Sequence, residues 1–310
     1  MKVLRIATRK SPLALWQAEF VAKRLQDINI GLQVELIAMS SEGDKLLDAP
    51  LAKFGGKGLF VKELERAIFE GIADIAVHSM KDMPVKVPDG LEIAVVMERG
   101  DVRDAFISTE GFLVDTIPAN RRIGTSSLRR RAQLLALRPD LKVESVRGGV
   151  HTRLSKLDEG QYDALVLAAS GLQRMGFEER ITQILEVNEM LPAVGQGVLG
   201  IECRTDDSGV KNVIGKLHHK LSGQLLTAER AMNAALQGGC QVPIGGHAWL
   251  LGETLKLSGM VSSLDGHTAL WECQSARLCE AHDLGERVAE SLLAQGAGQI
   301  LKEAFAQGGG

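Results

Sequence analysis

Short runs of β-branched and apolar residues alternate with longer segments of helical periodicity over the first two thirds of the chain. This alternation is typical of βαβ units, in which helices cover a largely parallel, doubly wound sheet. Ser11 and Pro12 have the residue types of an N-cap and a first-turn proline. The expected strands are residues 2–7, 32–39, 73–77, 91–96, 143–146, 163–168 and 198–203, and the expected helices are 12–26, 59–71, 127–137, 150–159 and 178–185.

The pattern changes after about residue 220. A helical segment, a Gly-Gly-Cys turn and further strand-like runs follow, which indicates a separate α+β domain. The expected elements are a helix over 222–236, strands over 247–251, 255–262 and 268–275, and a last helix over 283–305. Residues 98–101 and 192–197 have the composition of hinges between the preceding groups of elements.

The composition is that of an ordinary globular protein, with 310 residues, 45% of them hydrophobic. This length predicts two or three domains. The four cysteines include no CxxC pair and the histidines no HExxH, so neither a disulfide framework nor a zinc site is signalled, and a reducing cytosol fits best. Charged residues interrupt the N-terminal apolar run and no stretch approaches a membrane span, so we expect neither export nor membrane insertion.

Positive charge is concentrated in the middle of the chain. Residues 121–153 contain nine Arg or Lys against two acidic residues, an excess of seven, although the whole chain has a net charge of −3. Such clustering indicates an anionic ligand, either nucleic acid or a small polyanion. The aromatic content of 4% offers few stacking platforms and no nucleic-acid-binding module is evident, which favours the small polyanion.

Basic and hydroxyl residues recur where a predicted strand ends or a predicted helix begins. They lie in residues 8–11, 78–82, 125–131 and 147–153. Open α/β sheets bind ligands at the carboxyl ends of their strands, where helix N-termini and arginines attract carboxylates or phosphates. Any single arginine can instead be a solvated surface charge, but four groups at equivalent positions favour binding.

Two further residues are candidates for chemistry. Asp82 follows Lys81 directly after a predicted buried strand, where it can be either a helix cap or ion-pair partner or a catalytic carboxylate. Cys240 lies in the turn after Gly238 and Gly239. A free cysteine is usually a small buried hydrophobic residue, but paired glycines leave room for a bulky group against the backbone.

Several long motifs occur together in one order. They are HSMKDMP (78–84), GTSSLRRRAQL (124–134), VRGGVHTRLSKLD (146–158), AVGQGVLGIE (193–202) and ERAMNAALQGGCQVPIG (229–245). In these motifs the chain resembles the porphobilinogen deaminase (hydroxymethylbilane synthase) family, from Arg5 to about Gly266. Their number and order make this resemblance far more specific than any one motif.

The resemblance implies a transferase of tetrapyrrole biosynthesis that joins four porphobilinogen molecules into hydroxymethylbilane and releases ammonia. It also implies a dipyrromethane cofactor held by a thioether on Cys240. The implied fold has two doubly wound α/β domains like those of periplasmic binding proteins, joined by two crossovers, and a C-terminal α+β domain with a small antiparallel sheet. In this chain the domains would be residues 1–98 with 198–217, residues 99–197, and residues 218–310.

The resemblance also assigns roles to residues. Asp82 would be the catalytic group, because a carboxylate can stabilise the cationic azafulvene left when ammonia departs. The cofactor and the carboxylates of the growing chain would be bound in a basic cleft by Arg9, Ser11, Lys53, Lys57, Ser79, Lys81, Thr125, Ser126, Ser127, Arg129, Arg130, Arg147, Gly148, Arg153, Ser170, Arg174 and Gln196. The chain departs from the family pattern at Glu42, Gly149 and His151, which would alter a loop or one anion contact.

The alternative is a non-catalytic, two-lobed binding protein for a carboxylated solute, in which the arginines hold the ligand. The GGCQVP turn at 238–243 has no role in such a protein. We therefore expect a cytoplasmic, monomeric enzyme whose small-molecule substrate is porphobilinogen, without a metal, a nucleic acid or a membrane as partner.

Overall fold

The computed structural model describes residues 2–40, 61–239 and 242–308. Within these residues the chain separates into two compact units. Unit 1 contains the described residues up to 100 together with 197–223, and unit 2 contains residues 101–196 and those from 224 onward. The predicted boundaries of three domains are not tested by this division and stay a prediction.

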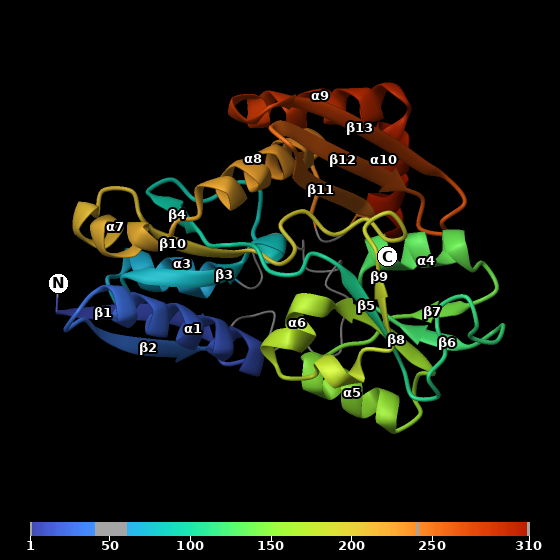
Figure 1. Ribbon diagram of the computed structural model, residues 1–310, viewed down its shortest axis with the longest axis horizontal. Helices are drawn as coiled ribbons and strands as arrows, with labels where there is room; N and C mark the ends of the chain where they lie inside the picture. The colour runs from blue at the N-terminus through green and yellow to red at the C-terminus, as the bar shows by residue number, and fades with distance from the viewer. Residues whose placement is uncertain (1, 41–60, 240–241, 309–310) are drawn as a thin grey trace. The chain divides into compact units, whose positions relative to one another are not determined.

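Unit 1 is built on a sheet with the strand order β2-β1-β3-β10-β4 (Figure 1). Its strands are β1 (Val3–Arg9), β2 (Gln33–Met39), β3 (Ile75–Ser79), β4 (Leu91–Val96) and β10 (Leu199–Arg204). β1 runs parallel to β2 and β3, whereas β10 is antiparallel to β3 and β4. The sheet is therefore mixed, but β10 is its single reversed strand and the other four run in the same direction, so the expectation of a largely parallel sheet is confirmed for unit 1.

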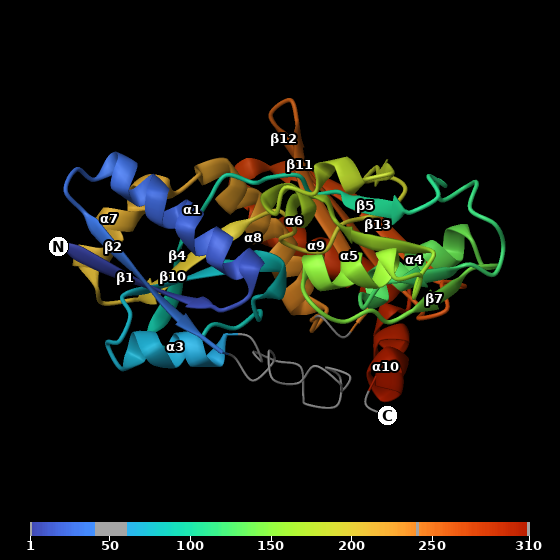
Figure 2. The same cartoon turned by 90° about the horizontal axis from the view of Figure 1, so that it is seen from below.

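Helices cover both faces of this sheet, with α1 and α3 on opposite sides (Figure 2). The helical elements are α1 (Pro12–Ile28), α3 (Lys62–Phe69), η2 (Met80–Asp82), α7 (Ser208–Ile214), η4 (Gly215–Leu217) and the start of α8 (Lys220–Ala235). The predicted cap of α1 is confirmed, since Ser11 Oγ accepts a hydrogen bond from the Ala14 N–H. One core lies between the sheet and α1 with α7, and the other between the sheet and α3.

Unit 2 contains a second mixed sheet, with the order β7-β6-β8-β5-β9. Its strands are β5 (Asp104–Ser108), β6 (Arg122–Gly124), β7 (Lys142–Glu144), β8 (Ala164–Ala168) and β9 (Gln183–Leu185). β6 is parallel to β7 and β8, while β5 lies antiparallel between β8 and β9. Helix α4 (Leu128–Leu137) covers one face of this sheet, and α5 (Val150–Asp158) with α6 (Ala169–Arg174) covers the other.

The expected helix over 178–185 is wrong. This segment forms the short η3 (Glu178–Arg180) and then strand β9. Ile184 and Leu185 pack on opposite faces of the sheet, so the apolar residues of this segment alternate as in a strand rather than along one helical stripe.

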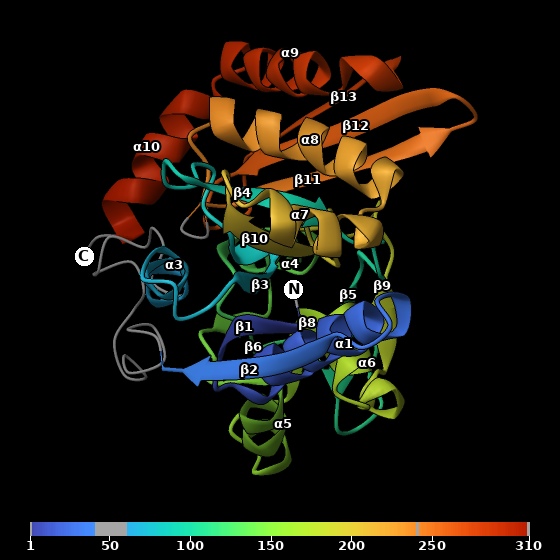
Figure 3. The same cartoon turned by 90° about the vertical axis from the view of Figure 1, so that its left-hand side faces the viewer.

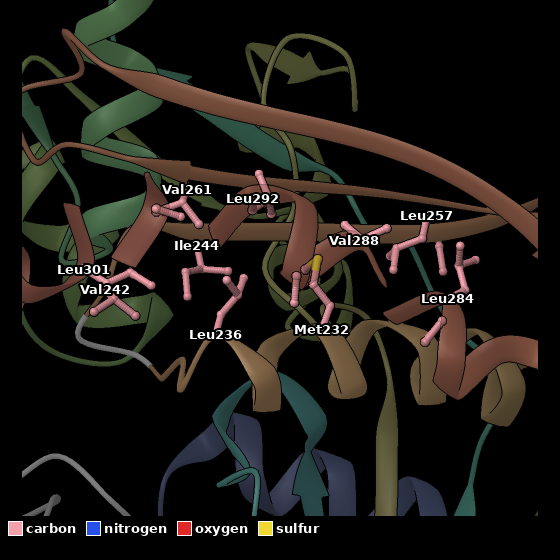
Figure 4. Packing of buried hydrophobic residues seen from close by; sticks show 14 of the residues in the cluster. Met232, Leu236, Val242, Ile244, Leu257, Val261, Leu284, Val288, Leu292 and Leu301 are labelled. Atoms are coloured by element: carbon pink, nitrogen blue, oxygen red, sulfur yellow. The ribbon is translucent and has the colours of Figure 1, made fainter. Parts of the chain in front are cut away.

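The remaining part of unit 2 carries the antiparallel sheet β11-β12-β13. Its elements are β11 (Ile244–Leu251), β12 (Thr254–Ser262), β13 (Ala269–Arg277), η5 (Leu278–Glu280), α9 (Ala281–Ala294) and α10 (Ala297–Gly308). Figure 3 shows α9 lying along this sheet. Side chains of α8, α9 and the sheet meet in a shared core, with Met232, Val288 and Leu257 among them (Figure 4).

The expected single helix over 283–305 is also wrong, because it breaks into α9 and α10. The break falls at Gly296, whose φ of 107° lies outside the helical region. Its N–H still bonds to the Leu293 carbonyl, which satisfies an orphan acceptor at the end of α9.

Candidate functional site

In unit 1, several predicted site residues follow strands that end at one edge of the sheet. Arg9 is the last residue of β1 and Ser79 the last of β3, and these strands are parallel neighbours. Ser11 caps α1 two residues after β1, and Lys81 and Asp82 lie in the η2 turn directly after β3. The structure therefore brings these residues to the carboxyl end of adjacent strands, where open α/β sheets bind ligands.

The η2 turn carries the predicted catalytic carboxylate on the surface. Asp82 is exposed in unit 1, so its carboxylate is accessible from solvent. The turn is anchored by Met80, which is buried and whose N–H bonds to the Val198 carbonyl. A Cβ on Gly200 would lie 2.2 Å from Met80 Sδ, so only glycine fits under the anchor.

Directly before this turn lies a buried polar pair. His78 Nε2 is 2.9 Å from Glu202 Oε2, and both side chains are inaccessible to solvent. Among the described residues, no hydrogen-bond partner is present for Glu202 Oε1. Burial raises the pKa of the nearby Glu65, and the charge of Glu202 raises it further. Unit 1 thus holds an acid-rich cluster of Glu65, His78 and Glu202 under the Asp82 turn.

In unit 2, hydroxyl residues follow strand β6. Thr125 is buried, and its N–H bonds to the Glu144 carbonyl at the end of β7. Ser126 Oγ donates to the Val146 carbonyl, and Ser127 caps α4 by accepting from the Arg130 N–H. Ser170 is buried just after β8, the parallel neighbour of β6. These residues also gather at the carboxyl ends of parallel strands.

The loop after β7 holds the next predicted group. Gly148 has a φ of 110°, a conformation that favours glycine, and its carbonyl accepts a bond of 2.8 Å from Arg153 Nε. The carbonyl of Arg147 accepts from Lys156 Nζ at 3.4 Å. The charged side chains of Arg147 and Arg153 are both partly exposed. The geometry suits capture of an anion by the loop and the start of α5.

Two of the three departures from the family pattern are structurally mild. Gly149 has an ordinary extended backbone, and a Cβ there would meet nothing within 4 Å. His151 is exposed, with its ring edge-on to Phe177 at a centroid distance of 6.0 Å. Nothing about these two positions disturbs the loop. Glu42 lies outside the described residues.

Arg129, Arg130 and Gln196 converge on one carboxylate that the sequence interpretation missed, that of Asp104. Asp104 accepts from Arg129 Nη2 at 2.7 Å, from Arg130 Nη2 at 2.8 Å and from Gln196 Nε2 at 2.9 Å. All four residues are buried, with exposures of 6% or less. Burial favours the neutral acid, but the Arg129 and Arg130 guanidinium groups outweigh it and hold the pKa of Asp104 well below its usual range.

Arg174 ends α6 and is partly buried. Burial lowers the pKa of its guanidinium to about 10.

Three predicted residues, Lys53, Lys57 and Cys240, lie outside the described residues. The turn that leads to Cys240 is described as far as Gly239. A Cβ on Gly238 would lie 2.0 Å from Asn233 Oδ1, so a larger residue there would displace the Asn233 side chain, whereas a Cβ on Gly239 would meet nothing within 4 Å. The end of α8 therefore packs tightly at Gly238, and the backbone beside the predicted attachment point is open.

Among the described residues, the grouped side chains that could hold a metal ion are His282, Asp283 and Glu286, all exposed on α9. Exposed groups of this kind are common in proteins that bind no ion there, so we assign no metal site to them. No described helix is both long and apolar enough to cross a bilayer.

The residues present fit a carboxylated cofactor. Arg129 Nε is buried without a hydrogen-bond partner in the described part of the chain, and two guanidinium groups face the single carboxylate of Asp104. A cluster with spare donors and excess positive charge suits a ligand that bears carboxylates.

The solved structures that match this chain are distant in sequence, and their TM-scores are low. The Bordetella pertussis BvgS periplasmic domain has 16% identity and a TM-score of 0.39, over 70% of this chain and 40% of that chain. The periplasmic VFT2 domain of B. pertussis BvgS has 16% identity and a TM-score of 0.40, over 74% and 92%. The Escherichia coli periplasmic aliphatic sulphonate binding protein SsuA has 11% identity and a TM-score of 0.41, over 76% and 71%.

Family comparison is far more specific. Residues 4–212 match the family described as "Porphobilinogen deaminase, dipyromethane cofactor binding domain". Residues 224–294 match "Porphobilinogen deaminase, C-terminal domain". The two matches follow each other in order and leave only short segments uncovered, and the chain therefore belongs to the porphobilinogen deaminase family.

Proposed function

We propose that this protein is a hydroxymethylbilane synthase. It joins four porphobilinogen units, one after another, to a dipyrromethane cofactor that is covalently bound through Cys240, and it releases ammonia at each addition. The observation that carries this proposal is the pair of consecutive family matches over residues 4–212 and 224–294. The enzyme is a transferase of tetrapyrrole biosynthesis, and we propose that it acts as a monomer in the cytoplasm.

The chemistry of the ligand explains the distribution of charge. Each porphobilinogen unit carries an acetate and a propionate, so the growing chain is a polyanion. When bound, the dipyrromethane supplies the pyrrole ring to which the first substrate unit is joined. Arg9, Arg147, Arg153 and Arg174 provide guanidinium groups for the carboxylates, together with Arg129 and Arg130. The proposed lysine contacts are Lys53, Lys57 and Lys81.

Asp82 is the proposed catalytic group. Its exposed carboxylate stands on a short turn at the end of a buried strand, with Met80 anchoring the turn from below. A fixed carboxylate stabilises the positive charge that develops on the substrate as ammonia leaves. It can also exchange a proton with the departing amine or with the ring carbon that is attacked.

The organisation proposed for the whole chain is two α/β domains, residues 1–98 with 198–217 and residues 99–197, followed by the cofactor-attachment domain over 218–310. The Gly-flanked turn supports this role for the last domain, because the backbone next to Cys240 is open at Gly239.

Intact-protein mass spectrometry tests the proposal. The purified wild type should carry the added mass of a dipyrromethane and should convert porphobilinogen to hydroxymethylbilane with release of ammonia. Cys240→Ser should fold, carry no added mass and be inactive, whereas Cys273→Ser, which replaces an exposed thiol on β13, should keep both mass and activity. An unmodified wild type that binds carboxylated solutes reversibly without turnover would instead identify a binding protein.

A further inference from the structure

Asp104 is the point at which three predicted ligand-binding residues meet. It is the first residue of β5, which lies between β8 and β9 in the sheet of unit 2. Its side chain is completely buried, and both of its carboxylate oxygens accept hydrogen bonds from guanidinium groups. Neither the family resemblance nor the sequence pattern assigned a role to this residue.

The guanidinium groups are held by further contacts. Arg129 Nη1 donates to the Leu191 carbonyl at 2.5 Å, and Arg130 Nη1 donates to the Val166 carbonyl at 3.2 Å. Gln196 Nε2 donates both to Asp104 and to the Val102 carbonyl, at 2.9 and 2.7 Å. The carboxylate therefore fixes the two arginines and the glutamine in one arrangement.

The charges of this cluster do not balance. In the described part of the chain, Asp104 is the only carboxylate that pairs with Arg129 or Arg130, so one positive charge is in excess. Burying an uncompensated charge is costly, and the Nε of Arg129 is a buried donor without a partner. Both observations indicate that the cluster is completed by an anion.

We propose that Asp104 is a positioning residue for the carboxylate-binding site. It orients Arg129, Arg130 and Gln196 and neutralises one of the two guanidinium charges, which leaves a single positive charge for one carboxylate of the cofactor or the growing chain. This inference rests on the proposed function, because the anion is taken from the substrate chemistry. Asp104 itself does not touch the reacting atoms.

Asp104→Glu is the most informative variant, because it keeps the charge and moves it by one methylene group. A misplaced carboxylate should misalign both arginines, so we expect the fraction of purified protein that carries the covalent cofactor to fall. In the loaded fraction, KM for porphobilinogen should rise about tenfold or more while kcat changes less, since a charge-assisted hydrogen bond is lost.

Phe106→Leu is the matched control, because Phe106 is a fully buried apolar residue on the same strand. It should lower Tm through lost packing without altering cofactor loading or KM. If Asp104→Glu, compared at similar Tm, loads cofactor and elongates the chain as this control does, Asp104 is merely structural and the inference is wrong.

A double-variant cycle tests the charge balance without depending on activity. Asp104→Asn should lower Tm strongly or prevent folding, because two buried guanidinium groups then lack a counter-charge. Adding Arg129→Gln to Asp104→Asn should raise Tm again, although cofactor loading should stay low. Strictly additive changes in Tm would overturn the proposed neutralisation.

The outcomes separate this inference from the proposed function. A wild type without covalent cofactor or turnover would refute the function itself. A wild type that is loaded and active, with an Asp104→Glu variant that behaves like Phe106→Leu, would refute only the role of Asp104.

Discussion

The two units bury polar clusters of opposite character beneath their predicted site residues. In unit 1 the cluster contains two carboxylates and one imidazole, from Glu65, Glu202 and His78. In unit 2 it contains one carboxylate and two guanidinium groups, from Asp104, Arg129 and Arg130. Both clusters lie in mixed sheets with helices on either face, so the difference arises from the side chains and not from the architecture.

The difference indicates a division of labour. The acid-rich cluster lies at the root of the turn that carries Asp82, the proposed catalytic group. The base-rich cluster lies at the start of α4, where carboxylates are proposed to bind. If this interpretation holds, changes in unit 1 should act mainly on kcat, and changes in unit 2 should act mainly on cofactor loading and KM.

Asp82→Asn should produce the largest effect. The amide keeps the shape of the side chain but removes the charge that stabilises a developing cation, so we expect kcat to fall by about 10²- to 10³-fold or more. Cofactor loading and Tm should stay close to those of the wild type, because Asp82 is exposed. Steady-state kinetics and intact mass check this. Near-normal turnover would show that the carboxylate is structural, and it would contradict the assignment of catalysis to unit 1.

Glu202→Leu should have the next largest effect. It leaves His78 without its buried partner and loosens the strand that supports the η2 turn, so kcat should fall by about tenfold to a hundredfold, the scale of a small misplacement of a catalytic group. KM should change little. Glu202→Gln, which can still bond to the imidazole, should recover most of the loss in kcat.

Cys203→Ala is the control for Glu202→Leu. Cys203 is the next residue of β10 and packs in the core on the other face of the sheet. It should reduce Tm without lowering kcat. Should the two variants lose kcat in parallel with Tm, the acid-rich cluster only stabilises the sheet.

Single arginine substitutions in unit 2 should have intermediate effects. Replacing Arg147 or Arg153 by Leu removes one charge-assisted contact, worth roughly 1.5 to 3 kcal/mol. Because different arginines would meet the chain at different lengths, we expect the variants to stall at different stages. Mass spectrometry of each enzyme after limiting porphobilinogen reads the bound ladder. Exposed Arg131 offers a control, and identical ladders for all variants would mean that the loop arginines are solvated surface charges.

The smallest expected effect concerns pH and differs in sign between the clusters. The pKa of Glu65 is raised above 4.5, so the folded state binds its proton more tightly and this group favours folding increasingly as the pH falls toward 4.5. The pKa of Asp104 is lowered below 3.8, so its contribution is present above that pH and is lost below it.

Urea titrations at several pH values measure these contributions. Glu65→Gln should remove part of the gain in unfolding free energy that the wild type shows as the pH falls toward 4.5. The exposed Glu70→Gln on the same side of unit 1 serves as the control. A Glu65→Gln profile that parallels the wild type would show that this carboxylate is not coupled to the cluster.

Local signals were sufficient for much of the fold. The Ser11-Pro12 start of α1 and the apolar strands β3, β4 and β8 depend on nearby residues, and the structure confirms them. The segment 178–185 was misread because helical and strand periodicity are hard to separate over so few residues. The helical pattern over 283–305 continues on both sides of Gly296, so it predicts one helix, whereas the positive φ of Gly296 ends α9.

Asp104 could not be identified in this way. Its partners Arg129 and Arg130 lie 25 and 26 residues later in the chain, and Gln196 lies 92 residues later. Strand β5 was not expected, so nothing placed its first residue in a core. An acidic residue at the start of the apolar run Ala105–Ile107, in a chain with paired arginines, was the available signal.

The position of β10 in the sheet of unit 1 has a consequence for synthesis on the ribosome. β10 lies between β3 and β4, and in the described part of the chain it is the strand that pairs with β4. Roughly a hundred residues separate β4 from β10, so a nascent chain exposes two unpaired strand edges until β10 emerges. The sheet of unit 2 closes with β9 at Leu185, before β10 begins. We therefore expect the order of folding to invert the order of the sequence, with the later sheet complete first.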